Sequence, residues 1–326
     1  MEFICQEPNR LDSAMSEALG LPRNQVEKLI KTLGVIINGH VVTKCSTKLC
    51  GGERIEYDFA QAVESQSAYA INFDVAILYE DDDLLIINKP PFLTVHPAPS
   101  VKEATLVDWL KYKGISLSTI SGEERHGIVH RIDKETSGAL VVAKNNEAHY
   151  ALSQQLEDKS MGRYYLALID LALKEDIVVD LPVARNPNHR LKMAVMKHGR
   201  AAKSAFCKIA LSKDNKIELI AAKLFTGRTH QIRVHLNALS RHIIGDSLYG
   251  FKSQNDTIPR VMLHAYILYL KHPKTGEVLR VKAPLMDDFE AQLLKKFDKE
   301  TIDEKITCDN IISRFDTVSD WVRKDT

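Results

Sequence analysis

The chain has 326 residues, 44% hydrophobic and 27% charged, and its 44 Lys and Arg residues almost balance 43 Asp and Glu residues. This length and composition suit one large domain or two smaller ones, and they exclude a disulfide-stapled miniprotein and a disordered chain. No apolar run reaches the roughly 18 residues of a membrane helix, and the acidic N-terminus lacks the basic start of an export signal. Five scattered cysteines without a CxxC pair predict reduced thiols in a cytoplasmic protein.

Residues 1–60 are predicted to form a small separate unit of helices and strands. Two helical patterns lie on either side of Pro22. Asn38-Gly39 lies between two β-branched runs, which is a strong signal for a hairpin. The polar residues 61–73 have no clear period and predict a linker.

Residues 74–298 are predicted to form one large, strand-rich domain. Two strands are expected around the acidic turn at 80–83, and further strands at 139–143, 164–169, 204–211, 216–224 and 267–270. Helices are expected over 104–113 and 146–159. Long strands with few intervening helices indicate an α+β fold with a large mixed or antiparallel sheet. Residues 299–326 are expected to be a loosely attached C-terminal tail.

The net charge of +1 hides an uneven distribution. Residues 185–252 contain 14 Lys and Arg against three acids, a local charge of +11, and five of the twelve histidines lie there too. The rest of the chain has 30 basic against 40 acidic residues. A solvated surface explains many short basic runs, but a block of this size with alternating apolar positions favours a polyanionic partner.

Two polar clusters carry the candidate chemistry. Residues 130–133 (HRID) lie between hydrophobic runs, where charge is costly, so they form either a structural ion pair or a reactive site. The second cluster, residues 226–236, contains Arg228 and Arg233. A guanidinium beside Asp133 would hold it ionised, as suits a nucleophile or base at a sugar or heteroaromatic centre. No GxGxxG, GxxxxGK[ST] or GxSxG motif supports a nucleotide cofactor or a serine hydrolase.

A zinc site is the alternative interpretation of the same clusters. The residues with ligand-like spacing are His126, His130, Asp133, His230 and His235. The region around His126 is expected to be a strand, in which His126 and His130 would lie about 13 Å apart, too far to share one zinc. No cysteine joins them, so we expect no metal site.

Five collinear segments resemble the RluA-type pseudouridine synthases, which isomerise uridine in RNA. They are residues 80–96, 130–144 (HRIDKETSGALVVAK), 163–169 (RYYLALI), 226–250 (TGRTHQIRVHLNALSRHIIGDSLYG) and 263–289. The resemblance covers most of the chain and implies the pseudouridine synthase fold. It also implies an isomerase that cleaves the glycosidic bond, rotates the uracil and reattaches it through carbon 5. Substrate and product contain the same atoms, so the resemblance implies no cofactor.

Carried over position by position, the resemblance assigns roles to individual residues. Asp133 would be the catalytic nucleophile, and Tyr165 the ring that stacks on the target base. Arg233, rather than Arg228, would pair with Asp133, although the sequence alone leaves both open. Arg131 would fill the space of the flipped uridine. The expected substrate-binding residues are Arg131, Arg228, His130, Thr229 and His230.

Residues 1–60 resemble the S-four-like (alpha-L) RNA-binding module, a small α/β domain, through residues 10–12, 23–30 and 37–39. This copy departs in charge, with seven bases against eight acids. Residues 180–206 look most like the RluD branch, which modifies large-subunit (23S) ribosomal RNA, and that RNA or its precursor is the expected partner. The alternatives are an RluC-like synthase with other ribosomal sites and a non-catalytic RNA-binding ribosome-assembly factor.

Overall fold

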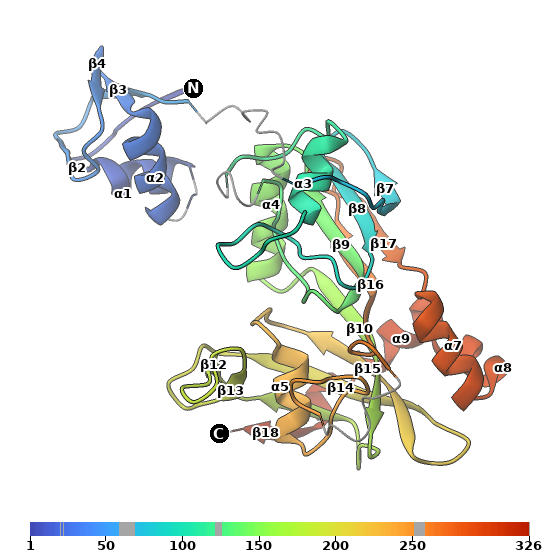
Figure 1. Ribbon diagram of the computed structural model, residues 1–326. Coiled ribbons are helices and arrows are strands. Elements are labelled where there is room, and N and C mark those ends of the chain that lie inside the picture. The colour runs from blue at the N-terminus through green and yellow to red at the C-terminus, as the bar shows by residue number, and fades with distance from the viewer. Residues whose placement is uncertain (20, 22, 59–68, 121–125, 251–257, 326) are drawn as a thin grey trace. The chain divides into compact units, whose positions relative to one another are not determined.

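The computed structural model describes residues 1–19, 21, 23–58, 69–120, 126–250 and 258–325 (Figure 1). The chain divides into two compact units. Unit 1 contains Met1–Ile71, His96–Ile128 and Ala143–Tyr150, and unit 2 contains Asn72–Val95, Val129–Val142 and Ala151–Thr326. Two segments that the sequence assigned to the large domain therefore group with unit 1. Most of the predicted linker, residues 61–68, lies outside the described residues.

The N-terminal part of unit 1 is a four-stranded sheet with two helices. In sheet order the strands are β1 (Glu2–Ile4), β6 (Arg54–Glu56), β3 (Val35–Ile37) and β4 (His40–Val42). The other elements are α1 (Leu11–Leu19), α2 (Arg23–Leu33) and the paired short strands β2 (Asn9–Arg10) and β5 (Lys48–Leu49). Asn38 and Gly39 both have positive φ, at 49° and 86°, so the predicted β3–β4 hairpin is confirmed.

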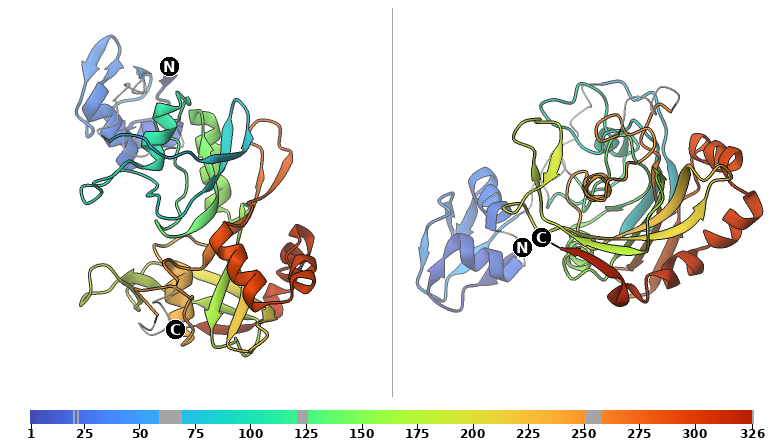
Figure 2. Two further views of the ribbon diagram at one scale, coloured as in Figure 1. Left: turned by 45° about the vertical axis from the view of Figure 1, so that its right-hand side comes forward. Right: turned by 90° about the horizontal axis from the view of Figure 1, so that it is seen from below.

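Unit 2 is built around a ten-stranded sheet of order β18-β11-β14-β15-β10-β16-β9-β8-β7, with β17 also pairing with β16 (Figure 2). Its strands are β7 (Ala76–Glu80), β8 (Leu84–Lys89), β9 (Ser137–Ala143), β10 (Gly162–Asp170), β11 (Ile177–Asp180), β14 (Lys203–Leu211), β15 (Ile217–Leu224), β16 (Leu263–Lys271), β17 (Val278–Lys282) and β18 (Val322–Asp325). The pairs β9–β16 and β11–β18 are parallel. The antiparallel pairs are β7–β8, β10–β15, β10–β16, β11–β14, β14–β15 and β16–β17. The expected α+β fold with a large mixed sheet is therefore confirmed.

The central strands are buried along their whole length. Every residue of β8, β9 and β10 is buried, which explains why these strands are mostly apolar and do not alternate between apolar and polar residues. β9 approaches β16 so closely that a Cβ added at Gly138 would lie 2.2 Å from the Ala265 carbonyl oxygen, and Gly138 has φ +114°. Glycine is required at this crossing.

Three further helices each follow a strand in the chain. α3 (Leu106–Tyr112) and α4 (Asn146–Glu157) are the two helices expected from the sequence, and α5 (Gln231–Ala238) follows β15. A capping box formed by Thr105 and Asp108 begins α3. A small hairpin, β12 (Val183–Arg185) and β13 (Met193–Val195), projects from unit 2. None of the described helices is long and apolar enough to cross a membrane.

The C-terminal residues are part of the fold, so the expected loosely attached tail is wrong. After α7 (Asp287–Lys296), the chain forms α8 (Lys299–Lys305), α9 (Cys308–Arg314), the 3-10 turn η2 (Val318–Asp320) and β18. Ile302, Ile311 and Phe315 are buried, and β18 pairs with β11. Hydrogen bonding to an existing strand stabilises a segment too polar to predict a strand by itself.

Candidate active site

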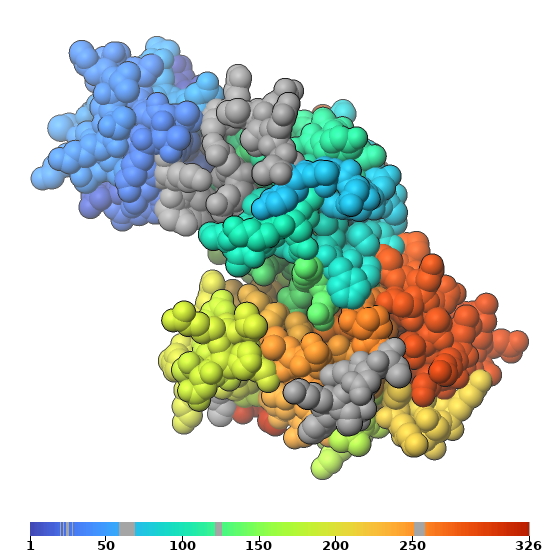
Figure 3. All heavy atoms as spheres, in the orientation of Figure 1, coloured from blue at the N-terminus to red at the C-terminus, as the bar shows by residue number. Residues whose placement is uncertain are grey.

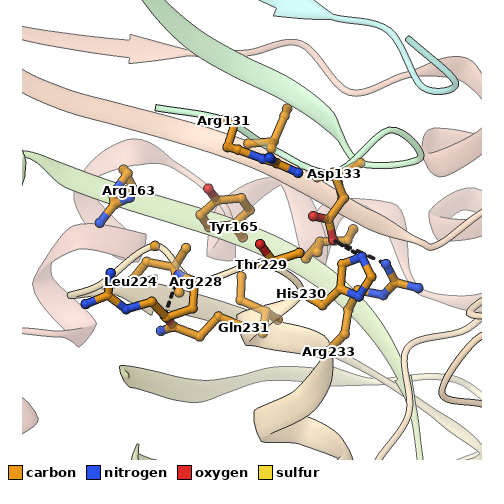
Figure 4. Close-up of a pocket in the computed structure, with 15 residues that line it drawn as sticks. Arg131, Asp133, Arg163, Tyr165, Leu224, Arg228, Thr229, His230, Gln231 and Arg233 are labelled. Atoms are coloured by element: carbon orange, nitrogen blue, oxygen red, sulfur yellow. Dashed lines mark hydrogen bonds and ion pairs between the residues drawn. The ribbon is translucent and has the colours of Figure 1, made fainter. Parts of the chain in front are cut away.

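A pocket in unit 2 forms where three segments meet (Figure 4). The first is the loop before β9, which contributes Asp133. The second is β10, which contributes Tyr165. The third is the turn after β15 together with the start of α5, which contributes Arg233. The two polar clusters recognised in the sequence therefore face one another across one pocket.

The pocket contains an ion pair between Asp133 and Arg233. Arg233 Nη1 donates to Asp133 Oδ2 at 3.2 Å, and its Nε and Nη2 donate to the two oxygens of Asp246 at 2.7 and 2.8 Å. Burial lowers the pKa of Arg233, but the Asp246 and Asp133 carboxylates outweigh it and raise that pKa above its ordinary value. Arg228 instead donates its Nε to the Ala201 carbonyl at 2.9 Å, so Arg233 is the arginine that pairs with Asp133.

A fully buried lysine holds the loop that carries Asp133. Lys89 Nζ, at the end of β8, donates to the carbonyls of Pro90, Leu93 and Lys134 at 2.7, 2.9 and 3.1 Å. Burial lowers the pKa of Lys89 to about 7, while Asp133 acts in the opposite direction. Because Lys134 is the neighbour of Asp133, this lysine ties the loop to the end of a buried strand.

Tyr165 presents its ring to the pocket from the middle of β10. Alternation along the strand directs neighbouring side chains to opposite faces. Tyr164 packs against Phe315, with ring centroids 5.5 Å apart, and Tyr165 lines the pocket. Burial raises the pKa of Tyr165 to about 12, so its hydroxyl stays protonated at neutral pH.

The turn before α5 is held in a specific conformation. His230 has a left-handed backbone, φ 55°, which is uncommon for a residue other than glycine. Its Nδ1 lies 3.0 Å from the Tyr249 hydroxyl and its Nε2 4.0 Å from Asp133 Oδ2. Gln231 Oε1 accepts from the Thr226 hydroxyl and the Arg228 N–H at 2.7 and 3.0 Å. This turn therefore directs His230 towards Asp133.

Seven of the eight residues expected in the site line the pocket, and His130 does not. His130 is buried, and its Nε2 accepts from the Val141 backbone N–H at 3.0 Å, so the structure gives it a contact with β9 instead. Burial lowers its pKa to about 3. The residues expected from the sequence that do line the pocket are Arg131, Asp133, Tyr165, Arg228, Thr229, His230 and Arg233.

The sequence did not single out Arg163, Gln231, Asp246 or Tyr249. Arg163 and Gln231 line the pocket. Asp246 and Tyr249 contact the guanidinium of Arg233. The Arg233 guanidinium lies over the Tyr249 ring, 5.1 Å from its centroid. All four fall within the segments of the family resemblance, which was the only signal that could have indicated them.

The five residues of the zinc alternative do not form one metal-binding group among the residues that the structure describes, although His230 lies near Asp133. The expected strand around His126 is wrong, because His126 and Gly127 form a turn in which Gly127 has φ +68°. Within the described ranges, the one group that could hold a metal is a different one, Asp81, Asp83 and His272. His272 Nδ1 accepts two backbone N–H groups, which leaves the proton on Nε2 to donate to Asp81 at 2.7 Å. Hydrogen bonds thus account for this cluster.

Exposed basic side chains lie on and beside the β12–β13 hairpin, which packs against α5. The β12–β13 hairpin, yellow-green in Figure 3, belongs to the basic block found in the sequence. Arg185, Arg190, Lys197 and Arg200 on and beside it are exposed. Such a surface attracts phosphate groups.

Comparisons with known proteins match both parts of the chain. Residues 83–238 match the family model described as RNA pseudouridylate synthase, and residues 9–55 match the S4 domain model. The chain is 46% identical over 313 residues to an uncharacterized RNA pseudouridine synthase of Helicobacter pylori strain J99, covering 94% of this chain and 95% of that protein.

Two further similarities agree with these matches. The chain is 39% identical over 292 residues to the ribosomal large subunit pseudouridine synthase D of Nitrosomonas europaea, covering 87% of this chain and 83% of that protein. The solved structure of human RNA pseudouridylate synthase domain containing 1 superposes with a TM-score of 0.55 at 25% identity, covering 67% of this chain and 87% of that one. The first family model spans Asp133, Tyr165 and Arg233.

Proposed function

We propose that this chain, which belongs to the RNA pseudouridylate synthase family and isomerises uridine to pseudouridine in RNA, modifies large-subunit (23S) ribosomal RNA with Asp133 as its nucleophile. Relatives named ribosomal large subunit pseudouridine synthase D, at 36–39% identity over most of the chain, support the choice of RNA. The S4 domain match and the exposed basic hairpin support an RNA-binding surface that extends beyond the pocket.

The observation that carries the catalytic proposal is the contact between Asp133 and Arg233. The guanidinium holds Oδ2 at 3.2 Å, whereas Oδ1 makes no hydrogen bond to any residue that the structure describes. A carboxylate with one oxygen held by a guanidinium and the other open is arranged for attack at the anomeric carbon. Tyr165 supplies the ring on which the target base stacks, and Arg131, which is exposed, fills the space that the flipped uridine leaves.

In the proposed reaction, Oδ1 of Asp133 bonds to C1′ of the ribose as the C1′–N1 bond breaks. The electron pair of that bond leaves with the uracil, which rotates within the pocket. Carbon 5 of the base then bonds to C1′ and displaces the carboxylate. C5 loses its proton and N1 gains one, so substrate and product have the same composition.

Replacing the carboxylate tests this proposal. We expect Asp133→Asn to lower the rate of pseudouridine formation by at least about 10³-fold, because removing a nucleophile removes most of the catalysis. Pseudouridine would be mapped in ribosomal RNA from cells that carry either the wild-type protein or the variant, with the exposed Asp287→Asn as the matched control. Unchanged modification in Asp133→Asn would refute the catalytic assignment. Sites lost only from RNAs other than 23S would refute the choice of substrate.

A further inference from the structure

Arg163 is a buried arginine of the pocket that has no partner among the residues that the structure describes. It lies on β10, its exposed fraction is 7%, and its guanidinium makes no hydrogen bond or ion pair with any described residue. Other buried arginines in unit 2 are paired. Arg233 binds Asp246 through two nitrogens, and Arg260 binds Asp288 in the same way.

An unpaired buried cation opposes folding. Moving a charge out of water is costly unless hydrogen bonds or an opposite charge replace the lost hydration. A native protein keeps such a group where another requirement outweighs the cost, and a ligand that completes its hydrogen bonds is one such requirement. Because Arg163 lines the pocket, the missing partner is expected to arrive with the substrate.

The position of Arg163 indicates which part of the substrate it meets. Arg163 and Tyr165 are two residues apart on one strand, so both face the pocket. In the close-up, Tyr165 lies between Arg163 and Asp133 (Figure 4). A uridine whose ribose lies at Asp133 and whose base stacks on Tyr165 directs the far edge of that base towards Arg163.

The chemistry of that edge matches the guanidinium. Uracil carries two carbonyl oxygens, which accept hydrogen bonds, and arginine offers only donors. The phosphates of the backbone remain outside, where Arg131 and Arg228 are more accessible than Arg163. A buried cation at the base edge is therefore better placed for a carbonyl than for a phosphate.

We propose that Arg163 binds a carbonyl oxygen of the target uracil and stabilises the negative charge of the detached base. This inference rests on the proposed function. When the C1′–N1 bond breaks, its electron pair enters the uracil ring and spreads onto both carbonyl oxygens. A preorganised cation in a site that excludes water stabilises such a charge far better than solvent does. Asp133 then acts at the sugar, and Arg163 acts on the leaving group.

The backbone beside Arg163 is shaped to admit it. A Cβ added at Gly227 would lie 2.8 Å from Arg163 Nη1, so the guanidinium rests directly on bare backbone. Gly227→Ala keeps the arginine but displaces its head. It therefore separates the presence of the charge from its position.

The first test removes the charge. The substrate is total RNA from cells that lack the protein, and the readouts are the single-turnover rate of pseudouridine formation, the Kd for RNA and the Tm. We expect Arg163→Met to lower the rate by about 10²–10³-fold, the loss typical of one oxyanion donor. The Kd should stay within about twofold, as a contact made chiefly in the transition state requires. Gly227→Ala should reproduce part of the loss in rate.

The Tm separates this role from a structural one. Removing an unpaired buried charge relieves a cost, so Arg163→Met should melt no lower than wild type. Arg260→Met is the matched control, because it leaves Asp288 without its partner and should melt lower. A lowered Tm in Arg163→Met, or a wild-type rate in that variant, overturns the proposal.

A phosphate contact is the competing outcome. It would weaken RNA binding in Arg163→Gln and reduce the slope of log affinity against log salt by about 0.7–0.9. An unchanged slope with a reduced rate supports the carbonyl contact, and a reduced slope overturns it. Different results would refute the proposed function itself: an Asp133→Asn variant that is still active, or modified sites that lie outside 23S RNA.

A change of leaving group tests the charge itself. Fluorine at carbon 5 makes the uracil anion more stable, so 5-fluorouridine depends less on a stabilising cation. With a transcript of the modified RNA that contains 5-fluorouridine, the ratio of wild-type to Arg163→Met rate should fall. C5 of this base carries fluorine and has no proton to lose, so the product to measure is the C5-linked nucleoside with water added at C6. Its formation, followed by mass spectrometry after nuclease digestion, gives both rates. An equal ratio on both RNAs would show that Arg163 does not stabilise the anion.

Discussion

The guanidinium of Arg233 binds two carboxylates in different ways. Asp246 is fully buried and takes two of its donors, and it also accepts the backbone N–H groups of Leu248 and Tyr249 at 3.0 Å. Asp133 is partly exposed and takes one donor. Asp246 therefore fixes the arginine, and the arginine in turn positions Asp133.

Asp246→Asn tests whether Asp246 holds Arg233 in place. We expect the free energy of unfolding to fall by about 3–5 kcal/mol, since removing one partner leaves a buried charge incompletely paired. The catalytic rate should fall as well, because Arg233 loses the contact that orients it. Urea unfolding and single-turnover assays measure the two effects.

Asp288→Asn is the matched control, because Asp288 pairs with Arg260 outside the pocket. That variant should lose stability without a comparable loss of rate. An Asp246→Asn protein with the stability and activity of wild type would contradict the positioning role.

At the residue scale, the sequence could indicate groups that carry a motif but not groups defined by burial. Asp133, Tyr165 and Arg233 stand in recognisable segments, and the structure brings them together. Arg163 and Asp246 look like ordinary charged residues in the sequence. Arg163 has no partner among the described residues, and Asp246 binds Arg233 through both carboxylate oxygens. Both properties depend on side chains that are distant along the chain.

At the element scale, the buried strands were predictable and the edges of the sheet were not. Apolar stretches within β8, β9 and β10 identify these strands, because both faces of each strand are covered. β17 and β18 are short, partly charged and largely exposed. Their pairing with β16 and β11 comes from hydrogen bonds that no local pattern encodes.

The β9–β16 crossing provides a test at this scale. Gly138→Ala combines a positive φ with a Cβ 2.2 Å from the Ala265 carbonyl oxygen, so the two strands must separate. Gly276 also has a positive φ, +73°, but a Cβ added there would meet nothing within 4 Å, so Gly276→Ala is the control. We expect the control to cost about 1 kcal/mol and Gly138→Ala several times more, measured by urea unfolding. If both variants lost the same free energy of unfolding, backbone strain alone would explain why glycine is needed at position 138.

At the scale of the whole molecule, buried histidines link stability to pH. His130, His235 and His264 lie inside unit 2, and burial lowers their pKa values to about 3, 4 and 4. His235 Nε2 lies 2.9 Å from the Leu181 carbonyl and its Nδ1 lies 3.1 Å from the Ser204 hydroxyl. The neutral ring satisfies both contacts.

The lowered pKa values of these histidines predict that the free energy of unfolding falls in mild acid. Below about pH 6.5 the unfolded chain binds protons at these rings, while the folded chain stays neutral until about pH 4. The unfolded state therefore binds more protons, and stability falls as the pH falls through this window. The shift at His235 corresponds to about 3 kcal/mol.

His235→Gln retains a donor and an acceptor but cannot titrate, so its stability should fall less between pH 7.5 and 4.5 than that of wild type. Urea unfolding at both pH values measures this difference. Exposed His198→Gln is the control and should follow wild type. A wild-type unfolding midpoint that does not change with pH would refute the prediction.

The ion pair of the pocket joins residues 100 positions apart in the chain. The entropic cost of closing so long a loop is met by strand pairing, chiefly of β10 with β15 and β16. Asp133 and Arg233 therefore meet only once the central sheet has formed. Without that sheet nothing holds the two side chains together, so the active site proposed above requires the completed fold of unit 2.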